Sequence, residues 1–423
     1  MGALTRFRRL GLALGLALLA MVGVAARPAG AQTLQAVSLH DAIDATLTRG
    51  TRVAVARADS SAARAGLVGA REWQNPTVNL QYTRDEPHYH GFLEIPLDYP
   101  WLRGPRIAGA ERAAQSASYT FALEQAAARF DAETSYVRAL ASVAHDSLSR
   151  VNRVVADSLR QLAIVRRDAG DASDLDVELA TVNAGQAANF SASDSLVKIA
   201  AVLGLQDVMG MRSDAVVIAL SDTLAVPAST PALTPALTPA LTSPADSGGA
   251  TLSVAAAQET VYSEEAAYKV ASRGAWAAPQ LSLGLEGGDP TQRFVLPAAG
   301  VLVPIPLFNQ NRGAAGLEAA NLDRARARLA ETRRQSAAAI ASAVRTRDAA
   351  VGRVRRDEAL LASATRVARL SLTAFAEGAE TLPAVMEAQR SARDALAQYI
   401  DDVATAAADA AAVRFFTSTV NAQ

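Results

Sequence analysis

One composite segment occurs twice in this chain and limits the folds that the chain can adopt. Each copy has a short apolar run that stops at prolines, a polar turn with an Arg–Gly pair, and a long alanine-rich stretch. The copies begin at 93–104 and 301–313, and their arginines lie 209 positions apart (312 − 103). Proline cannot donate to a sheet ladder and alanine is the best helix former. Each copy therefore predicts a strand, a turn and a very long helix.

Two further landmarks keep nearly the same offset. Residues 75–82 correspond to 278–285 upstream, and the turn 169–173 corresponds to 377–381 downstream, with glycines 208 positions apart (378 − 170). Several landmarks in one order at one offset indicate an internal duplication. Each half is predicted to contain helix, strand, loop, strand, long helix, turn and helix.

In the first half the leading helix is predicted to run from Val37 to about Trp73, with Ser38 as its N-cap. The first long helix is predicted to run from Pro105 to about Asp168.

The composition is typical of long helices rather than of a bulky globular core. Hydrophobic residues make up 50% of the chain but aromatic residues only 5%, and alanine accounts for the difference. A helix of about sixty residues reaches roughly 90 Å, which no single globular domain requires. Apolar residues in the first long helix recur at coiled-coil spacing: Val137, Leu140, Ala144, Leu148, Val151, Val155, Leu159 and Leu162. Each long helix should pack along its length against other long helices.

The predicted strands form two widely separated hairpins. Residues 77–84 and 281–285 alternate apolar and polar side chains, and 92–97 and 294–303 are the return strands. An isolated hairpin is marginally stable, so this sheet needs partners. Alternation suits a membrane β-barrel with its apolar face toward lipid, or a small soluble sheet that is half buried. The export signal described next and the long helices favour the barrel.

The chain divides into five parts. Residues 1–31 form a signal peptide, with early arginines, an apolar stretch and a small-residue cleavage site; a membrane anchor is the alternative. Residues 32–220 are the first repeat. Residues 221–250 are a low-complexity Pro/Thr/Ala linker. Residues 251–416 are the second repeat, and 417–423 are a C-terminal tail.

Several kinds of chemistry are not expected. The net charge is −1 with no basic stripe, so nucleic acid is not an expected partner. There is no cysteine, and no arrangement pairs a nucleophile with a base, so the chain is not predicted to be an enzyme or to bind a cofactor. His88 and His90 lie in a predicted polar loop, and two ligands are too few for a metal site.

In these features the chain resembles the TolC-like outer-membrane efflux factors. The export signal, the strand opening at Asn75-Pro76, the duplicated strand–turn–helix and the two tip turns carry the resemblance, over about 37–416. The stretch 303–313 is most similar to the cation-efflux branch. The resemblance implies a mainly α protein with a small β part. Three copies would each contribute four strands to a 12-stranded outer-membrane β-barrel, and duplicated antiparallel helical hairpins to an α-barrel.

The same resemblance implies a location, partners and cargo. The homotrimer would be held in outer-membrane lipid and extend into the periplasm, as a passive exit duct for metal cations or small toxic compounds. It would dock to a periplasmic adaptor, itself coupled to an inner-membrane pump of the RND or ABC type.

Candidate site residues follow from matching the family's motifs to this sequence. The adaptor-docking tips would be Gly170, Ser173 and Val177 in the first half and Gly378, Thr381 and Val385 in the second. Glycine and hydroxyl residues also cap helices, so both roles are expected at these positions. Glu387 or Asp176 would line the pore constriction, where family members often carry an acidic pair. An exposed helical carboxylate is the alternative for both acids.

Two other functions remain compatible with the sequence. A periplasmic adaptor or spacer also uses long helical hairpins, although two strand pairs in two repeats favour the channel. The exit duct of a type I protein secretion system would have the same architecture with a different pump.

Overall fold

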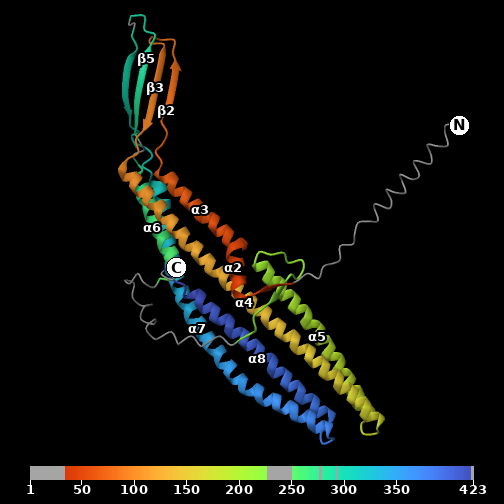
Figure 1. Ribbon diagram of the computed structural model, residues 1–423. Coiled ribbons are helices and arrows are strands. Elements are labelled where there is room, and N and C mark those ends of the chain that lie inside the picture. Colours follow the sequence, from red (N-terminus) through yellow and green to blue (C-terminus); the bar gives the residue numbers. More distant parts are fainter. Residues whose placement is uncertain (1–33, 226–249, 276–278, 292–293, 421–423) are drawn as a thin grey trace, which may run out of the picture.

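The computed structural model describes residues 34–225, 250–275, 279–291 and 294–420. The predicted signal peptide and most of the predicted linker lie outside these residues. The described part is a rod with a sheet at one end and two helical hairpins at the other (Figure 1). None of the described helices is long and apolar enough to cross a lipid bilayer.

Two helical hairpins, one from each repeat, form the lower half of the rod. In the first, α4 (Pro100–Asp168) is followed by the antiparallel α5 (Asp174–Val208). In the second, α7 (Arg312–Ala376) is followed by α8 (Leu382–Phe416). At 1.5 Å per residue the 69 residues of α4 span about 100 Å. The predicted duplication of long helical hairpins is confirmed.

The upper half of the rod is a row of four helices. The helices α3 (Thr51–Arg71), α4, α6 (Leu252–Arg273) and α7 contact one another in that order (Figure 1). The outer members of the row are therefore α3 and α7. Because α4 and α7 continue into the hairpins below, each long helix packs against different partners along its length.

The two predicted strand pairs join into one antiparallel sheet. Its strands are β2 (Thr77–Tyr82), β3 (Tyr89–Pro96), β5 (Gln280–Gly287) and β6 (Leu296–Leu302), in the order β2-β3-β5-β6. The repeats meet where β3 pairs with β5. The outer strands β2 and β6 have no further strand beside them in the described residues.

A small second sheet at mid-height was not predicted. The strand β1 (Gln35–Val37) pairs in parallel with β4 (Ile218–Leu220), which is too short to show alternation. The Tyr136 hydroxyl lies 2.9 Å from both the Val37 carbonyl and an Asp222 carboxylate oxygen, which share its one proton. Burial and the hydrogen bond to Asp222 raise the pKa of Tyr136 to about 12. Asp222, in the predicted linker, is thus bound to the first repeat.

The prediction of one helix from Val37 to about Trp73 is wrong. Val37 belongs to β1, and the helix is divided at Gly50 into α2 (Leu39–Arg49) and α3. A Cβ on Gly50 would collide with the Thr46 carbonyl, so only glycine fits this bend. The predicted cap at Ser38 is confirmed, because its hydroxyl accepts from the Asp41 amide at 3.2 Å.

Pro105 does not begin α4 as predicted, since the helix starts five residues earlier at Pro100. A proline inside a helix leaves the carbonyl four residues before it without a helical donor. Here that carbonyl belongs to Trp101, and Arg273 at the end of α6 donates to it at 3.4 Å. The partner helix thus satisfies the group that the proline frees.

The packed face of α4 differs from the predicted apolar stripe. Leu140 and Leu159 are buried as expected, whereas Val151 is 60% exposed and Leu162 36%. Small residues such as Ala139, Ala156 and Ala163 fill much of the contact, which allows close approach of the helices. Part of the predicted stripe is therefore exposed in the single chain.

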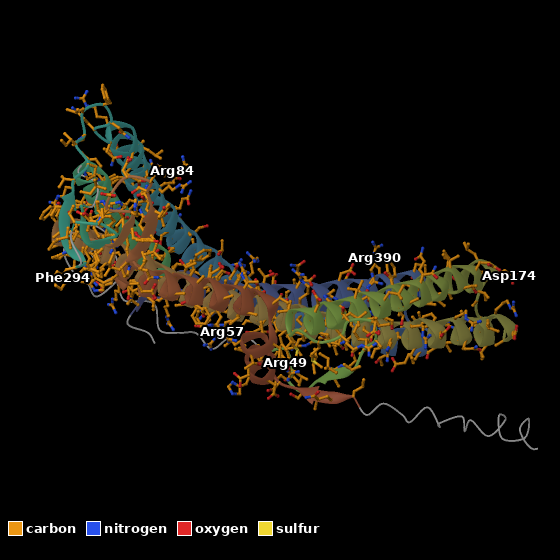
Figure 2. The ribbon with its side chains drawn as sticks, turned by 90° about the horizontal axis from the view of Figure 1, so that it is seen from above. Arg49, Arg57, Arg84, Asp174, Phe294 and Arg390 are labelled. Carbon is orange, nitrogen blue, oxygen red and sulfur yellow. The ribbon has the colours of Figure 1, made fainter. Side chains whose placement is uncertain are left out.

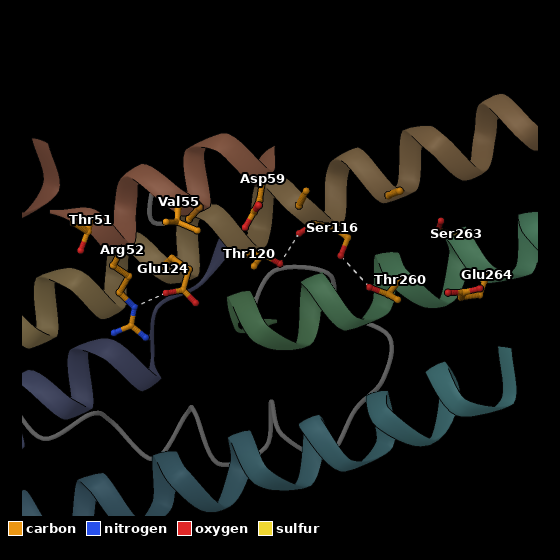
Figure 3. Close-up of a pocket in the computed structure, with 13 residues that line it drawn as sticks. Thr51, Arg52, Val55, Asp59, Ser116, Thr120, Glu124, Thr260, Ser263 and Glu264 are labelled. Atoms are coloured by element: carbon orange, nitrogen blue, oxygen red, sulfur yellow. Dashed lines mark hydrogen bonds and ion pairs between the residues drawn. The ribbon is translucent and has the colours of Figure 1, made fainter. Parts of the chain in front are cut away.

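A shallow groove runs over α4 between α3 and α6 (Figure 3). Arg52 pairs with Glu124 at one end, and Ser116 donates to the Ala256 carbonyl at 2.9 Å. Most of the lining side chains are small, and of the charged ones Arg52 and Glu124 are paired and Asp59 is exposed. The groove is an open furrow between helices rather than an enclosed pocket.

Candidate functional site

The predicted site residues gather at the hairpin ends, far from the sheet. Figure 2 shows Asp174, at the start of α5, at the opposite end of the molecule from Phe294, which precedes β6. The two tips come from equivalent places in the two repeats, 169–173 and 377–381.

Both long helices end in the same way. Gly170 (φ +84°) and Gly378 (φ +77°) have left-handed backbone conformations, which favour glycine. The next amide in each case bonds back to a carbonyl of the last turn, from Asp171 to Arg166 and from Ala379 to Ala374, both at 2.8 Å. The predicted caps at these glycines are confirmed.

The helices that follow begin differently. Ser173 accepts a bond from the Asp176 amide at 3.2 Å and Asp176 accepts from the Ser173 amide at 3.0 Å, a complete capping box. Thr381 begins α8 without a side-chain cap bond, and a proline occupies its first turn instead. The two tips share a backbone path but not a capping chemistry.

Val177 and Val385 lie behind the tips and not on their surface. Val177 is 9% exposed and Val385 0%, in an apolar cluster formed by both hairpins. The cluster comprises Leu159, Ala163, Val177, Ala180, Phe375, Leu382 and Val385. Arg166 of α4 covers the ring of Phe375 from α7. Of the predicted docking residues, Gly170, Ser173, Gly378 and Thr381 are exposed.

The two candidate constriction acids have different surroundings. The hydroxyl and amide of Ser173, and more weakly Arg166, hold the pKa of the Asp176 carboxyl below its usual range. Asp176 is therefore engaged in holding the start of α5. Glu387, on α8, is exposed and forms no ion pair with any described residue.

The sheet has one apolar and one mostly polar face. Strand register and alternation place the apolar side chains together: Val78, Leu80, Tyr82, Tyr89, Leu93, Ile95, Leu281, Leu283, Leu285, Pro297, Ala299 and Val301. Many are exposed, including Leu80 at 80%. The opposite face is mostly polar or small on β2, β3 and β5, with Phe92 and Pro96 as the exceptions, and apolar or small on β6. An exposed apolar face of this size marks a surface that contacts lipid or protein.

Aromatic side chains lie at both ends of the sheet. The rings of Tyr82 and Tyr89 lie 5.4 Å apart at the loop end, and Phe294 there is 84% exposed. At the helical end, the rings of Tyr99 and Trp101 stack at 4.1 Å. Such belts are typical of the two interfaces of a membrane-spanning sheet.

The prediction that His88 and His90 lie in one loop is partly wrong, because β3 begins at Tyr89. The Nδ1 atom of His90 lies 3.4 Å from Glu286 of β5, and its Nε2 lies 3.1 Å from the Thr83 hydroxyl. Among the described residues no group of three or more potential ligands could hold a metal ion.

Comparison with known proteins gives matches in structure only. No protein-family model and no curated protein matches this sequence. A membrane protein from Pseudomonas aeruginosa superposes with a TM-score of 0.74 at 18% identity, over 90% of this chain and 93% of that one. The outer membrane protein VceC of Vibrio cholerae gives 0.72 at 15%, over 90% and 96%. The CmeC outer membrane channel of Campylobacter jejuni gives 0.69 at 14%, over 90% and 85%.

The fold is therefore that of outer-membrane channel proteins of the TolC type. The resemblance that the sequence indicates is confirmed at the level of the fold, over nine-tenths of the chain in each of these superpositions.

Proposed function

We propose that this chain is one subunit of a trimeric outer-membrane channel, the passive exit duct of a tripartite efflux system. One observation carries the proposal: the sheet exposes a continuous apolar face, and no other described strand pairs with either of its edge strands. An unpaired edge with an apolar face is a liability in water, and closure into a barrel removes it. Lipid would cover the apolar face and the polar face would line a lumen.

Three copies would complete both parts of the duct. Four strands from each would close a barrel of twelve, with β6 of one copy beside β2 of the next. The helical row would close in the same way, with α7 of one copy beside α3 of the next. Apolar side chains exposed on these two helices support such contacts, since Val68 of α3 is 59% exposed and Leu317 of α7 is 61% exposed.

The helical end would reach into the periplasm and dock to an adaptor protein. Gly170, Ser173, Gly378 and Thr381 are the exposed positions at the tips, and the buried Val177 and Val385 would support them from behind. Glu387, which is exposed and forms no ion pair within the described part of the chain, is the better placed of the two acids to line a constriction. The inner-membrane pump, of the RND or ABC type, would supply the energy, and no catalysis is assigned to this chain.

The cargo we propose is metal cations or small toxic compounds. The alternative function, the exit duct of a type I secretion system, would use the same architecture with a different inner-membrane pump. A periplasmic adaptor or spacer is less well supported, because its surface would leave the apolar face of the sheet in water.

Membrane fractionation of the full-length protein tests the proposal. We expect the mature protein in the outer-membrane fraction, and a band in gel electrophoresis that moves from trimer to monomer on heating. Recovery in the soluble periplasmic fraction as a single chain would refute the proposal and favour the adaptor.

A further inference from the structure

The mostly polar face of the sheet is acidic and carries no fixed positive charge. Its acidic side chains are Glu94 on β3 and Glu286 on β5, and none of the four strands contains a lysine or an arginine. Strand register places both glutamates on the face opposite the apolar one, since Glu94 pairs with Ser282 and Glu286 with His90. This face therefore has a negative potential of its own.

The two carboxylates occupy different heights along the sheet. Glu94 lies four positions from His90, the strand partner of Glu286, which corresponds to about 13 Å along β3. Phe92 lies between them, its ring close over Gly284 and parallel to the His90 ring within 7°. The aromatic ring gives the space between the carboxylates an apolar wall.

The partners of each carboxylate are neutral or weakly basic. Glu94 accepts a bond from the Thr77 hydroxyl at 3.3 Å. Glu286 lies 3.4 Å from Nδ1 of His90, whose other ring nitrogen contacts the Thr83 hydroxyl. Among the residues that the structure describes, no lysine or arginine forms an ion pair with either carboxylate.

We propose that Glu94 and Glu286 are specificity-determining residues that favour cations at the barrel end of the duct. The inference rests on the proposed function, because it needs the mostly polar face to line a lumen. Three copies would then set one ring of carboxylates at each height. Rings of like charge in a narrow pore attract counter-ions and repel ions of their own sign. This filter would be separate from the tips, where Asp176 is engaged in a cap.

The cysteine-free sequence allows a test in which charge is removed and restored at one position. The full-length Glu94→Cys channel is placed in planar lipid bilayers under a KCl gradient, and the cation-to-anion permeability ratio is measured. The free thiol is then converted to a sulfonate or to a trimethylammonium form with methanethiosulfonate reagents, and labelling is verified by mass.

We expect the ratio to fall by about twofold or more with the free thiol, to recover with the sulfonate, and to fall further with the ammonium form. The same ratio in all three forms, with complete labelling, would overturn the inference. Glu94→Gln and Glu286→Gln, which keep the side-chain shape, provide the same measurement if the cysteine variant does not assemble.

Leu93→Cys is the matched control, because Leu93 is the neighbouring residue on the apolar face. Its thiol should not react with either water-soluble reagent in the bilayer. If the Leu93→Cys thiol reacts and the permeability ratio shifts as it does at Glu94, the apolar face lines the lumen. That result would overturn the inference. If the wild-type protein forms no channel, the proposed function fails as well, whereas a wild-type channel insensitive to Glu94 and Glu286 removes only this inference.

Discussion

The guanidinium carbon of Arg166 lies 4.8 Å from the centre of the Phe375 ring, and its Nη1 donates to the Phe375 carbonyl at 3.2 Å. Arg166 lies in the last turn of α4 and Phe375 in the last turn of α7, so one side chain joins the tips of the two repeats. A cation over an aromatic face is attracted to the ring, and this attraction is stronger where water is excluded. The relative position of the hairpin ends depends on this contact and the apolar cluster around it.

Replacing Phe375 should loosen the tips. Truncating a core phenylalanine to alanine typically costs about 3–5 kcal/mol, and Phe375 is 5% exposed. We expect Phe375→Ala to raise the conductance or open time of the channel in planar bilayers. Phe375→Leu, which keeps apolar volume but not the aromatic face, should have a smaller effect. Currents of Phe375→Ala that equal those of the wild type would show that the cluster does not restrain the tips.

The two tips should respond differently to loss of their hydroxyl groups. Ser173→Ala removes a complete capping box and should destabilise the first turn of α5 by about 1 kcal/mol. Thr381→Ala should change little, because the Thr381 side chain makes no cap bond. Amide hydrogen exchange at the starts of α5 and α8 compares the variants directly. Equal acceleration at both tips would contradict the assignment of the cap to Ser173.

Gly284 should be the most sensitive glycine of the sheet. A Cβ at Gly284 would collide with the Phe92 ring, whereas one at Gly300 on the adjacent strand meets nothing within 4 Å. We therefore expect Gly284→Ala to reduce the yield of heat-modifiable trimer and Gly300→Ala to leave it unchanged. Adding Phe92→Leu to Gly284→Ala should restore part of the yield. Equal yields from the two alanine variants would contradict the packing of Phe92 over Gly284.

Tyr136 should ionise later than an ordinary tyrosine. Its pKa in the folded protein, about 12, lies above the ordinary value of 10.0. Its contribution to stability is thus fully present below pH 10 and is lost as the pH rises through about 12. The difference in ultraviolet absorbance between the wild type and Tyr136→Phe, measured in the folded proteins, should change with a midpoint near pH 12. At pH 8 the variant should be less stable by about 1 kcal/mol, through loss of the bonds to Val37 and Asp222. A difference spectrum that titrates near pH 10 would contradict the burial of this hydroxyl.

The long helices and the strand pairs were predictable because their signals extend over many residues. An alanine-rich run without proline predicted α7, and alternation predicted β2 and β5 within a few residues. The duplication added a check, since each element had to occur twice at nearly one offset. The tip glycines were predictable because a left-handed helix end favours glycine.

The remaining features depend on contacts between segments far apart in the sequence. The early start of α4 depends on Arg273, which donates to the carbonyl that Pro105 leaves free. The pairing of β1 with β4 joins residues more than 180 positions apart, and three residues are too few to show a period. Val177 and Val385 were assigned to the docking surface, and their burial follows from how the two hairpins meet. No pattern in the sequence around either valine predicts how the two hairpins pack against each other.

We infer that one chain is one of three identical subunits, and that only the trimer forms a closed barrel. Native mass spectrometry of the mature protein, released from detergent micelles, measures the number of chains directly. The account predicts a single species of three chains, stable only while detergent or lipid covers the apolar face of the sheet. A monodisperse single chain that remains in aqueous buffer without detergent would contradict it.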